Sequence, residues 1–228
     1  MAQVSVLKQT FSGSLYRKIF LYLGIALQLM AYFVMPGQNL LSLFSGITGI
    51  IAVVLCAEKK LAYYWFAWPQ LISYLILAYN QKLYGEVYEN VFYVVTMIIG
   101  MYIWFKHKDN INGIDEVKPK KLTGLQFSII FGLMLIIIGI LYFIFENYTD
   151  DTQPLLDSVT TVPAFIAQIL LTFRYREQWV FWFIINVGSI FMWLNAGDYC
   201  MFAQYVFWAA NAGLGWYMWS RKTQNKAV

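Results

Sequence analysis

Long apolar runs, each followed by a short polar segment, recur along the whole chain. A helix needs roughly 20 residues to cross the ~30 Å hydrocarbon layer of a membrane, and eight of the runs approach that length. The pattern therefore predicts eight membrane-spanning helices, at about residues 17–35, 38–56, 61–80, 88–105, 124–145, 157–173, 178–195 and 199–219. The first run lacks a small-residue cleavage site and further runs follow it at once, so we interpret it as a helix and not as a signal peptide.

The composition supports the same interpretation. Hydrophobic residues make up 60% of the chain and charged residues only 12%, which lies outside the usage of ordinary soluble proteins. We therefore expect an all-α polytopic membrane protein, embedded in a lipid bilayer.

Basic residues predict how the helices are oriented, because lysine and arginine concentrate in the cytoplasmic loops of membrane proteins. If the N-terminus is cytoplasmic, 15 of the 16 basic residues fall on the cytoplasmic side and only Lys82 on the other. The 15 are Lys8, Arg17, Lys18, Lys59, Lys60, Lys106, Lys108, Lys118, Lys120, Lys121, Arg174, Arg176, Arg221, Lys222 and Lys226. Both termini are therefore predicted to be cytoplasmic, and the net charge of +4 needs no nucleic-acid partner to explain it.

The segments on the two sides of the polar loop at 106–123 look alike. At an offset of 114 residues, Trp65 and Trp68 match Trp179 and Trp182. After one inserted residue, Tyr84, Val91, Phe92, Gly100, Tyr102 and Trp104 match Tyr199, Val206, Phe207, Gly215, Tyr217 and Trp219. The pattern indicates a duplicated three-helix unit, with chance matches among the many aromatic residues as the alternative. Since one helix separates the two units, both run in the same direction through the membrane, as in SWEET transporters.

This duplication divides the chain into five parts. We expect an N-terminal segment with the first helix, a first three-helix bundle, a cytoplasmic loop with a linker helix, a second three-helix bundle and a basic cytoplasmic tail. The predicted boundaries are 1–37, 38–105, 106–156, 157–219 and 220–228.

Two stretches of the chain resemble the PnuC family of vitamin transporters. They are "KLYGEVYENVFYVVTMIIGMYIW" in the first unit and "YREQWVFWFIINVGSIFMWLNAGDYCMFAQYVFWAANAGLGWYMWSR" in the second, which contains the pattern Trp-x-x-Trp-x-x-x-Asn. The resemblance implies a three-plus-one-plus-three bundle, often a homotrimer, in a bacterial inner membrane. It also implies facilitated diffusion of nicotinamide riboside, which a cytosolic kinase then traps by phosphorylation. Thiamine and, after it, riboflavin are the alternative substrates, because relatives carry them.

The Trp-x-x-Trp-x-x-x-Asn pattern is the first candidate binding site. Residues i, i+3 and i+7 share one helix face, so Trp179, Trp182 and Asn186 form one stripe. An indole face attracts a desolvated cation such as a pyridinium, and an amide binds hydroxyls or a carboxamide. The alternatives are an interfacial aromatic belt for Trp179 and an interhelical hydrogen bond for Asn186.

Two further polar stripes are predicted to complete the cavity wall. Gln204 and Asn211 lie on the last helix, and at an offset of 115 they match Glu89 and Thr96 on the fourth helix. Asn90 and Tyr93 belong to the same fourth-helix stripe. An intramembrane carboxylate such as Glu89 would complement a cationic vitamin, although it could simply be hydrated near the outer surface. Structural packing is the alternative for the other members of both stripes.

Other features of the sequence argue against an enzyme. The chain has one histidine, His107, in a lysine-rich loop, and its two cysteines, Cys56 and Cys200, have no metal-ligand spacing. We therefore expect no catalytic residues, no metal and no cofactor. The centres of the predicted spans hold no ionisable residue, which predicts transport that is not coupled to protons or sodium. Gly100, Gly213 and Gly215 are expected to permit close helix contacts.

Overall fold

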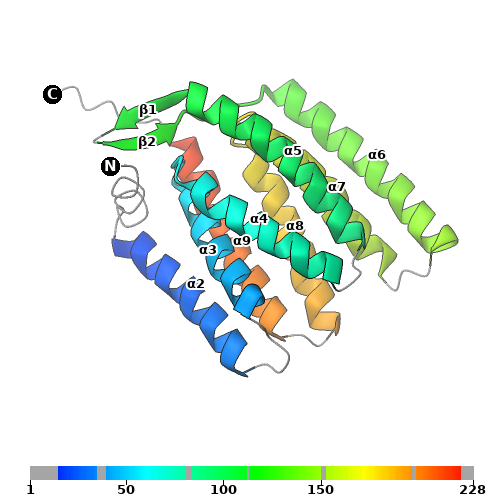
Figure 1. Ribbon diagram of the computed structural model, residues 1–228. Helices are drawn as coiled ribbons and strands as arrows, with labels where there is room; N and C mark the ends of the chain where they lie inside the picture. Colours follow the sequence, from blue (N-terminus) through cyan, green and yellow to red (C-terminus); the bar gives the residue numbers. More distant parts are fainter. Residues whose placement is uncertain are drawn as a thin grey trace.

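Eight helices and one small β-hairpin make up the described part of the computed structural model, which comprises residues 15–34, 40–80, 84–111, 113–149, 153–196 and 199–221 (Figure 1). The helices are α2 (Leu15–Val34), α3 (Leu40–Ala57), α4 (Tyr63–Asn80), α5 (Tyr84–Lys106), α6 (Gly124–Tyr148), α7 (Pro154–Thr172), α8 (Gln178–Ala196) and α9 (Tyr199–Ser220). Each predicted helix is present within about four residues of its predicted bounds. The expected all-α architecture is confirmed.

The hairpin was not predicted. It consists of β1 (Lys108–Ile111) and β2 (Ile114–Val117), an antiparallel pair inside the polar loop between α5 and α6. Gly113 occupies the turn with a φ of 75°, a conformation that glycine adopts without steric cost. The strands are only four residues long and carry three acidic residues and a lysine, so neither length nor hydrophobicity distinguishes them from a loop.

All eight helices have one end near the hairpin. At this hairpin end, α3 is followed by α4, α5 leads into β1, and α7 is followed by α8 (Figure 1). Consecutive helices therefore run in opposite directions. The helices α3, α4 and α5 run in the same directions as α7, α8 and α9, respectively. This is the predicted parallel arrangement of two three-helix units.

Six helices form a closed ring. Neighbours contact one another in the order α3, α4, α5, α7, α8, α9 and back to α3. The two units therefore meet at two places, where α5 contacts α7 and where α9 contacts α3. The remaining helices lie outside the ring on opposite flanks, α2 against α3 and α9, and α6 against α7 (Figure 1).

The turn at the hairpin end has the same backbone geometry in both units. Lys59 and Arg174, 115 positions apart, both adopt a positive φ, of 61° and 67°. The hydrogen bonds around them repeat at the same spacing: the Lys60 N–H donates to the Leu55 carbonyl, as the Tyr175 N–H does to Leu170. The offset at this turn is therefore 115.

This offset corrects the predicted alignment of α4 with α8. The offset of 114 matched Trp65 with Trp179, but Trp65 is 59% exposed whereas Trp179 is buried. At 115, the partner of Trp179 is the buried Tyr64. The error arose because both helices carry two tryptophans three residues apart, which align well in the wrong register.

The second strand of the hairpin and the residues that follow it join the two units through backbone hydrogen bonds. On one side, the Leu61 N–H donates to the Asp115 carbonyl at 3.1 Å and the Val117 N–H to the Lys59 carbonyl at 2.9 Å. On the other, the Lys120 N–H donates to the Arg174 carbonyl at 2.7 Å. Residues 115–120, which we call the linker strip, thus hold both turns side by side.

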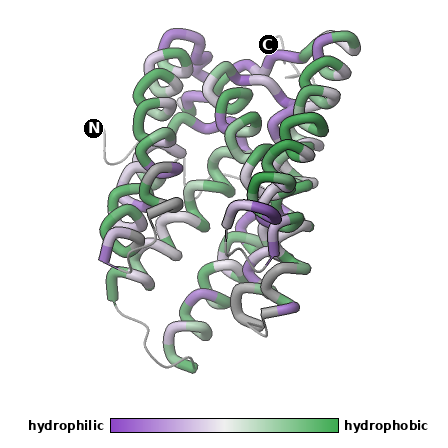
Figure 2. Tube along the Cα trace, turned by 90° about the vertical axis from the view of Figure 1, so that its right-hand side faces the viewer, coloured by the Kyte–Doolittle hydropathy of each residue, from purple (hydrophilic) through white to green (hydrophobic). Residues whose placement is uncertain are grey.

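All eight helices have 18 to 25 residues, which is the length of a membrane span, and they differ in composition. By length and composition, α2, α3, α6 and α7 are suited to cross a membrane. The helices α4, α5, α8 and α9 are of similar length but carry more aromatic and polar residues. Figure 2 shows hydrophobic residues along most of the helices and hydrophilic residues gathered at the hairpin end. All nine candidate site residues lie on α5, α8 and α9.

Candidate functional site

Two tryptophans close the hairpin end of the ring with reciprocal hydrogen bonds. The Trp104 indole N–H, on α5, donates to the Leu171 carbonyl of the second unit at 3.1 Å. The Trp219 indole N–H, on α9, donates to the Cys56 carbonyl of the first unit at 3.0 Å. The two donors are 115 positions apart in the chain, and so are the two acceptors. The same bond is therefore made twice, about a twofold pseudo-axis.

These tryptophans belong to a larger aromatic cluster. The Trp104 and Trp219 ring centroids are 5.7 Å apart, and Trp219 also lies edge-on to Trp179 at 6.0 Å. Tyr64 packs edge-on against Trp104 at 5.5 Å. We call Tyr64, Trp104, Trp179 and Trp219 the aromatic plug, since all four are buried and they lie between the two units.

Glycines on α5 and α9 make room for two members of the plug. A Cβ atom at position 215 would overlap the indole of Trp179, and one at position 100 would lie 2.9 Å from the Tyr64 hydroxyl. The prediction of close helix contact is confirmed at both positions. It is wrong for Gly213, where no described residue of another helix has an atom within 4 Å of an added Cβ.

Trp179 is a core residue and not a member of an interfacial belt. It is 4% exposed, and its indole N–H has no hydrogen-bond partner within the described residues. Trp182, one turn further along α8, is half-buried and contacts both of the two main hydrophobic clusters. The alternative of a lipid-facing belt is therefore excluded for Trp179.

Asn186 completes this row on α8 and is 5% exposed. No described residue makes a hydrogen bond with its side-chain amide. The interhelical hydrogen bond considered as its alternative role is therefore absent from the described part of the chain. We call Trp179, Trp182 and Asn186 the α8 stripe.

The polar residues of α9 only partly follow the prediction. The Asn211 amide donates to the Val53 carbonyl of α3 at 3.3 Å, while its buried side-chain oxygen has no partner among the described residues. Gln204 is half-buried, two turns away on the same helix. Asn211 therefore joins the two units and also leaves one acceptor unused.

On α5, the predicted stripe divides into two parts. Thr96 is structural: its hydroxyl accepts a hydrogen bond from the Gln168 amide of α7 at 3.0 Å, and its carbonyl accepts one from the Thr172 hydroxyl. Nearer the other end of the helix, the Tyr93 hydroxyl donates to the Glu89 carboxylate. The adjacent Asn90 is buried.

The α5 and α9 stripes were predicted to face each other. This is wrong for Thr96 on α5 and for Asn211 on α9. Thr96 contacts Gln168, and the equivalent Asn211 contacts Val53, which itself is equivalent to Gln168 at the offset of 115. Each residue therefore connects its helix to the neighbouring unit in the ring. The packing alternative describes Thr96 correctly.

Gln178 is a buried polar residue that the sequence analysis missed. It is the first residue of α8 and has no exposed surface, and neither atom of its amide has a partner among the described residues. A glutamine in the first turn of a helix usually faces solvent, so composition alone gave no signal. Its burial follows from the tertiary structure, in which the linker strip crosses the turn that precedes α8.

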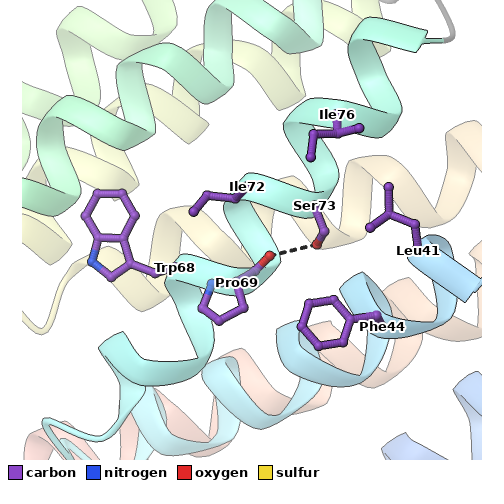
Figure 3. Close-up of a pocket in the computed structure, with 7 residues that line it drawn as sticks. All are labelled: Leu41, Phe44, Trp68, Pro69, Ile72, Ser73 and Ile76. Carbon is purple, nitrogen blue, oxygen red and sulfur yellow. Dashed lines mark hydrogen bonds between the residues drawn. The ribbon is translucent and has the colours of Figure 1, made fainter.

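A groove between α3 and α4 does not fit a polar ligand. Its volume is about 400 Å³, and its lining residues are Leu41, Phe44, Trp68, Pro69, Ile72, Ser73 and Ile76 (Figure 3). The only hydroxyl in the lining, that of Ser73, donates to the Pro69 carbonyl at 2.8 Å. The lining contains no charged residue and no amide side chain.

Charged residues cluster at the hairpin end. Arg17 of α2 is 2.8 Å from the Glu58 carboxylate, which also pairs with Lys60. Burial lowers the pKa of Lys60 and raises the pKa of Glu116 on β2. This network ties α2 and the hairpin to the first unit. His107, at the end of α5, is exposed, as its surrounding sequence suggested.

Comparison with known proteins gives concordant matches. The sequence model of the family described as "Nicotinamide mononucleotide transporter" matches residues 39–221. The nicotinamide riboside transporter PnuC of Haemophilus influenzae is 30% identical over 226 residues, which is 97% of each chain. The protein of that name from Neisseria mucosa is 28% identical and is covered over 84% of its length.

One solved structure matches most of the fold. The crystal structure of the vitamin B3 transporter PnuC superposes with a TM-score of 0.78 at 27% sequence identity. The superposition covers 94% of this chain and 95% of the other. The ring of two parallel units, with its additional helices, is therefore an arrangement that the two proteins share.

Proposed function

Because the chain belongs to the nicotinamide mononucleotide transporter family, the family of the PnuC proteins, we propose that it imports nicotinamide riboside across a bacterial inner membrane. The α8 stripe is the observation that carries this proposal. It combines two indole rings with Asn186, a residue that is 5% exposed and whose side chain makes no hydrogen bond with the described residues. A membrane-buried amide needs a polar partner, and a ligand would supply one.

The chemistry of nicotinamide riboside suits these groups. Its pyridinium ring is a cation, and an indole face stabilises a desolvated cation by ~2 kcal/mol or more. Its ribose hydroxyls and carboxamide can exchange hydrogen bonds with Asn186, and with the unused Asn211 side-chain oxygen. Trp182 packs against the hydrophobic cluster that contains residues of both units, so it is placed to bind a ligand between them.

The other predicted site residues have more distant roles in this proposal. Glu89, held by Tyr93, supplies negative charge that attracts a cationic vitamin near the end of the ring opposite the hairpin. Asn90 on α5 and Gln204 on α9 contribute further polar groups. Thr96 positions α5 against α7 and is not assigned a contact with the vitamin.

The distribution of basic residues supports an orientation with the hairpin end, and hence both termini, in the cytoplasm. The termini themselves lie outside the described residues. The chain carries out no chemical step, and no cofactor or metal takes part. A separate cytosolic kinase phosphorylates the vitamin after entry. The family resemblance favours a homotrimer as the functional assembly.

Transport is expected to be passive. Among the described residues, the central turns of the helices contain no ionisable side chain that could relay a proton or bind sodium. In liposomes without ion gradients, labelled nicotinamide riboside should equilibrate and stop. A proton or sodium gradient at zero membrane potential should not drive it further, whereas trapping by an enclosed kinase with ATP should.

Liposomes without the protein provide the control for leakage. A membrane potential must be clamped because 100 mV adds ~2.3 kcal/mol of driving force for each positive charge. Uphill uptake at zero potential, without a trapping enzyme, would contradict a passive mechanism. Unlabelled thiamine and riboflavin, added as competitors, test the alternative substrates.

Substitutions in the α8 stripe are expected to weaken binding of the vitamin. Trp182→Ala removes a cation-π partner and Asn186→Leu leaves polar groups of the ligand unpaired, so each should cost ~1–3 kcal/mol of binding free energy. Phe183→Ala, on the exposed face of the same helix, is the matched control. Isothermal titration calorimetry with the purified protein measures the effect. If folded Trp182→Ala and Asn186→Leu proteins bind as tightly as the wild type, the stripe has only a packing role.

A further inference from the structure

Arg174 is a buried cation without a buried anion beside it. It follows α7 at the hairpin end and is 4% exposed. One of its guanidinium nitrogens, Nη1, donates to the Lys118 carbonyl at 3.3 Å, while the buried Nε has no partner within the described residues. No carboxylate of the described chain lies within ion-pair distance. Burial lowers the pKa of this guanidinium, as expected for a cation that lacks a counter-ion.

The equivalent residue of the first unit has acidic neighbours. Lys59 lies 4.0 Å from the Glu116 carboxylate, and Glu58 precedes it in the chain. At the offset of 115, the position of Glu58 is occupied by Phe173 in the second unit. Two turns with the same backbone thus differ in charge: in the first, Glu116 lies 4.0 Å from Lys59, whereas the carboxylate of the second, Glu177, pairs with Arg176.

The linker strip increases this difference. The backbone of Lys60 forms a β-bridge with the acidic Glu116 of the strip, whereas the backbone of the equivalent Tyr175 forms one with the basic Lys120. The Lys120 ammonium lies 5.6 Å from the centre of the Tyr175 ring and forms no ion pair with a described residue. Lys120 is exposed, and its backbone N–H donates to the Arg174 carbonyl at 2.7 Å, so the two residues lie side by side at the surface of the strip.

Glu177, the acidic residue nearest to Arg174 in the sequence, already has partners. One oxygen of the Glu177 carboxylate accepts from the Arg176 guanidinium at 3.0 Å, and the other accepts from the Leu122 N–H at 3.1 Å. Glu177 therefore neutralises Arg176 and fixes the chain before α6. A buried guanidinium with unused donors is costly unless an anion binds it, and its planar fork suits the oxygens of phosphate.

We propose that Arg174 and Lys120 form a binding site for a phosphate-bearing anion at the hairpin end of the second unit. A soluble phosphate compound and the headgroup of an anionic phospholipid offer the same oxygens, and both are present at a cytoplasmic membrane surface. The site is separate from the α8 stripe. It requires neither the proposed vitamin nor transport.

Binding can be measured with the full-length protein in neutral detergent. Calorimetric titration with inorganic phosphate tests a soluble anion, and native mass spectrometry of phosphatidylglycerol adducts tests a lipid. Arg174→Gln should weaken whichever anion binds by about 10- to 100-fold, the usual contribution of a charge-assisted hydrogen bond pair. Arg174→Lys, which keeps the charge, should lose less. Arg221→Gln, an exposed arginine at the same end, is the matched control and should bind as the wild type does.

The outcomes distinguish a soluble phosphate compound from a phospholipid headgroup, and both of these from an arginine with only a structural role. Phosphate binding that depends on Arg174 identifies a soluble anion, and lipid adducts that depend on it identify a headgroup. If neither probe depends on Arg174, the proposal is wrong. Melting without any anion gives a second criterion: Arg174→Gln should be at least as stable as the wild type, because it removes an unpaired buried charge. A less stable variant that also shows no loss of anion binding would assign Arg174 to packing.

Discussion

Replacing Gly215 with alanine is expected to abolish most vitamin binding, whereas the same replacement at Gly213 on the same helix should leave binding intact. A Cβ at position 215 would overlap the Trp179 indole, while one at position 213 meets no atom of another described helix within 4 Å. Trp179 cannot move away easily, because it packs against Trp219 and is buried between the units. The extra methyl group must therefore displace α9 or the indole.

Overpacking of this kind costs about 1–3 kcal/mol, and a displaced indole no longer presents the α8 stripe in its original geometry. Both alanines should gain about 1 kcal/mol of helix propensity over glycine, so Gly213→Ala should be slightly stabilised. The difference between the two variants thus isolates the steric contact. Thermal unfolding and calorimetric titration of nicotinamide riboside measure both effects. Equal behaviour of the two variants would show that Gly215 and Trp179 are not closely packed.

The second large effect is expected at the reciprocal tryptophans. Trp104→Ala and Trp219→Ala should each lower the free energy of unfolding by about 3–5 kcal/mol, because each removes a large buried ring and a hydrogen bond to the other unit. The two losses should be similar, since the residues occupy equivalent positions. The phenylalanine variants keep the ring and lose the N–H, so they should cost only about 1–3 kcal/mol.

Trp65→Ala is the matched control for these substitutions. Trp65 is exposed on the outer side of α4, and surface changes usually alter stability by less than about 0.5 kcal/mol. Denaturant unfolding in detergent compares the series. A control variant as unstable as Trp219→Ala, or phenylalanine variants as stable as the wild type, would contradict a role of the two bonds in joining the units.

Hydropathy predicted the helices well because a membrane span imposes a length. Each of the eight apolar runs corresponds to a helix, and even the run interrupted by Pro163 forms one. The start of α7 was placed three residues late, because Pro154 begins it and polar residues occupy its first turn. The hairpin was missed for the opposite reason: its two short polar strands are formed by tertiary contacts with the turn after α3.

The candidate site could be predicted only in part. Helical spacing placed Trp179, Trp182 and Asn186 in one row, in which the first and last residues are buried and Trp182 is half-buried, because that spacing is a property of the helix itself. Spacing could not show that Thr96 binds Gln168, since that contact depends on which helices are neighbours in the ring. Arg174 was counted only as an indicator of topology, and its burial comes from a strip more than 50 residues earlier in the chain.

The linker strip limits which changes of sequence the protein can accept between residues 115 and 120. Its bonds to the two turns are made by backbone atoms of Asp115, Val117 and Lys120, so most side chains in the strip can be exchanged without breaking them. The number of residues between those backbone atoms, in contrast, must stay the same for the hydrogen bonds to form. A single insertion or deletion between 117 and 120 would put the next N–H out of reach of the Arg174 carbonyl. This short segment should therefore tolerate substitution freely and changes of length poorly, whereas ordinary surface loops accept both.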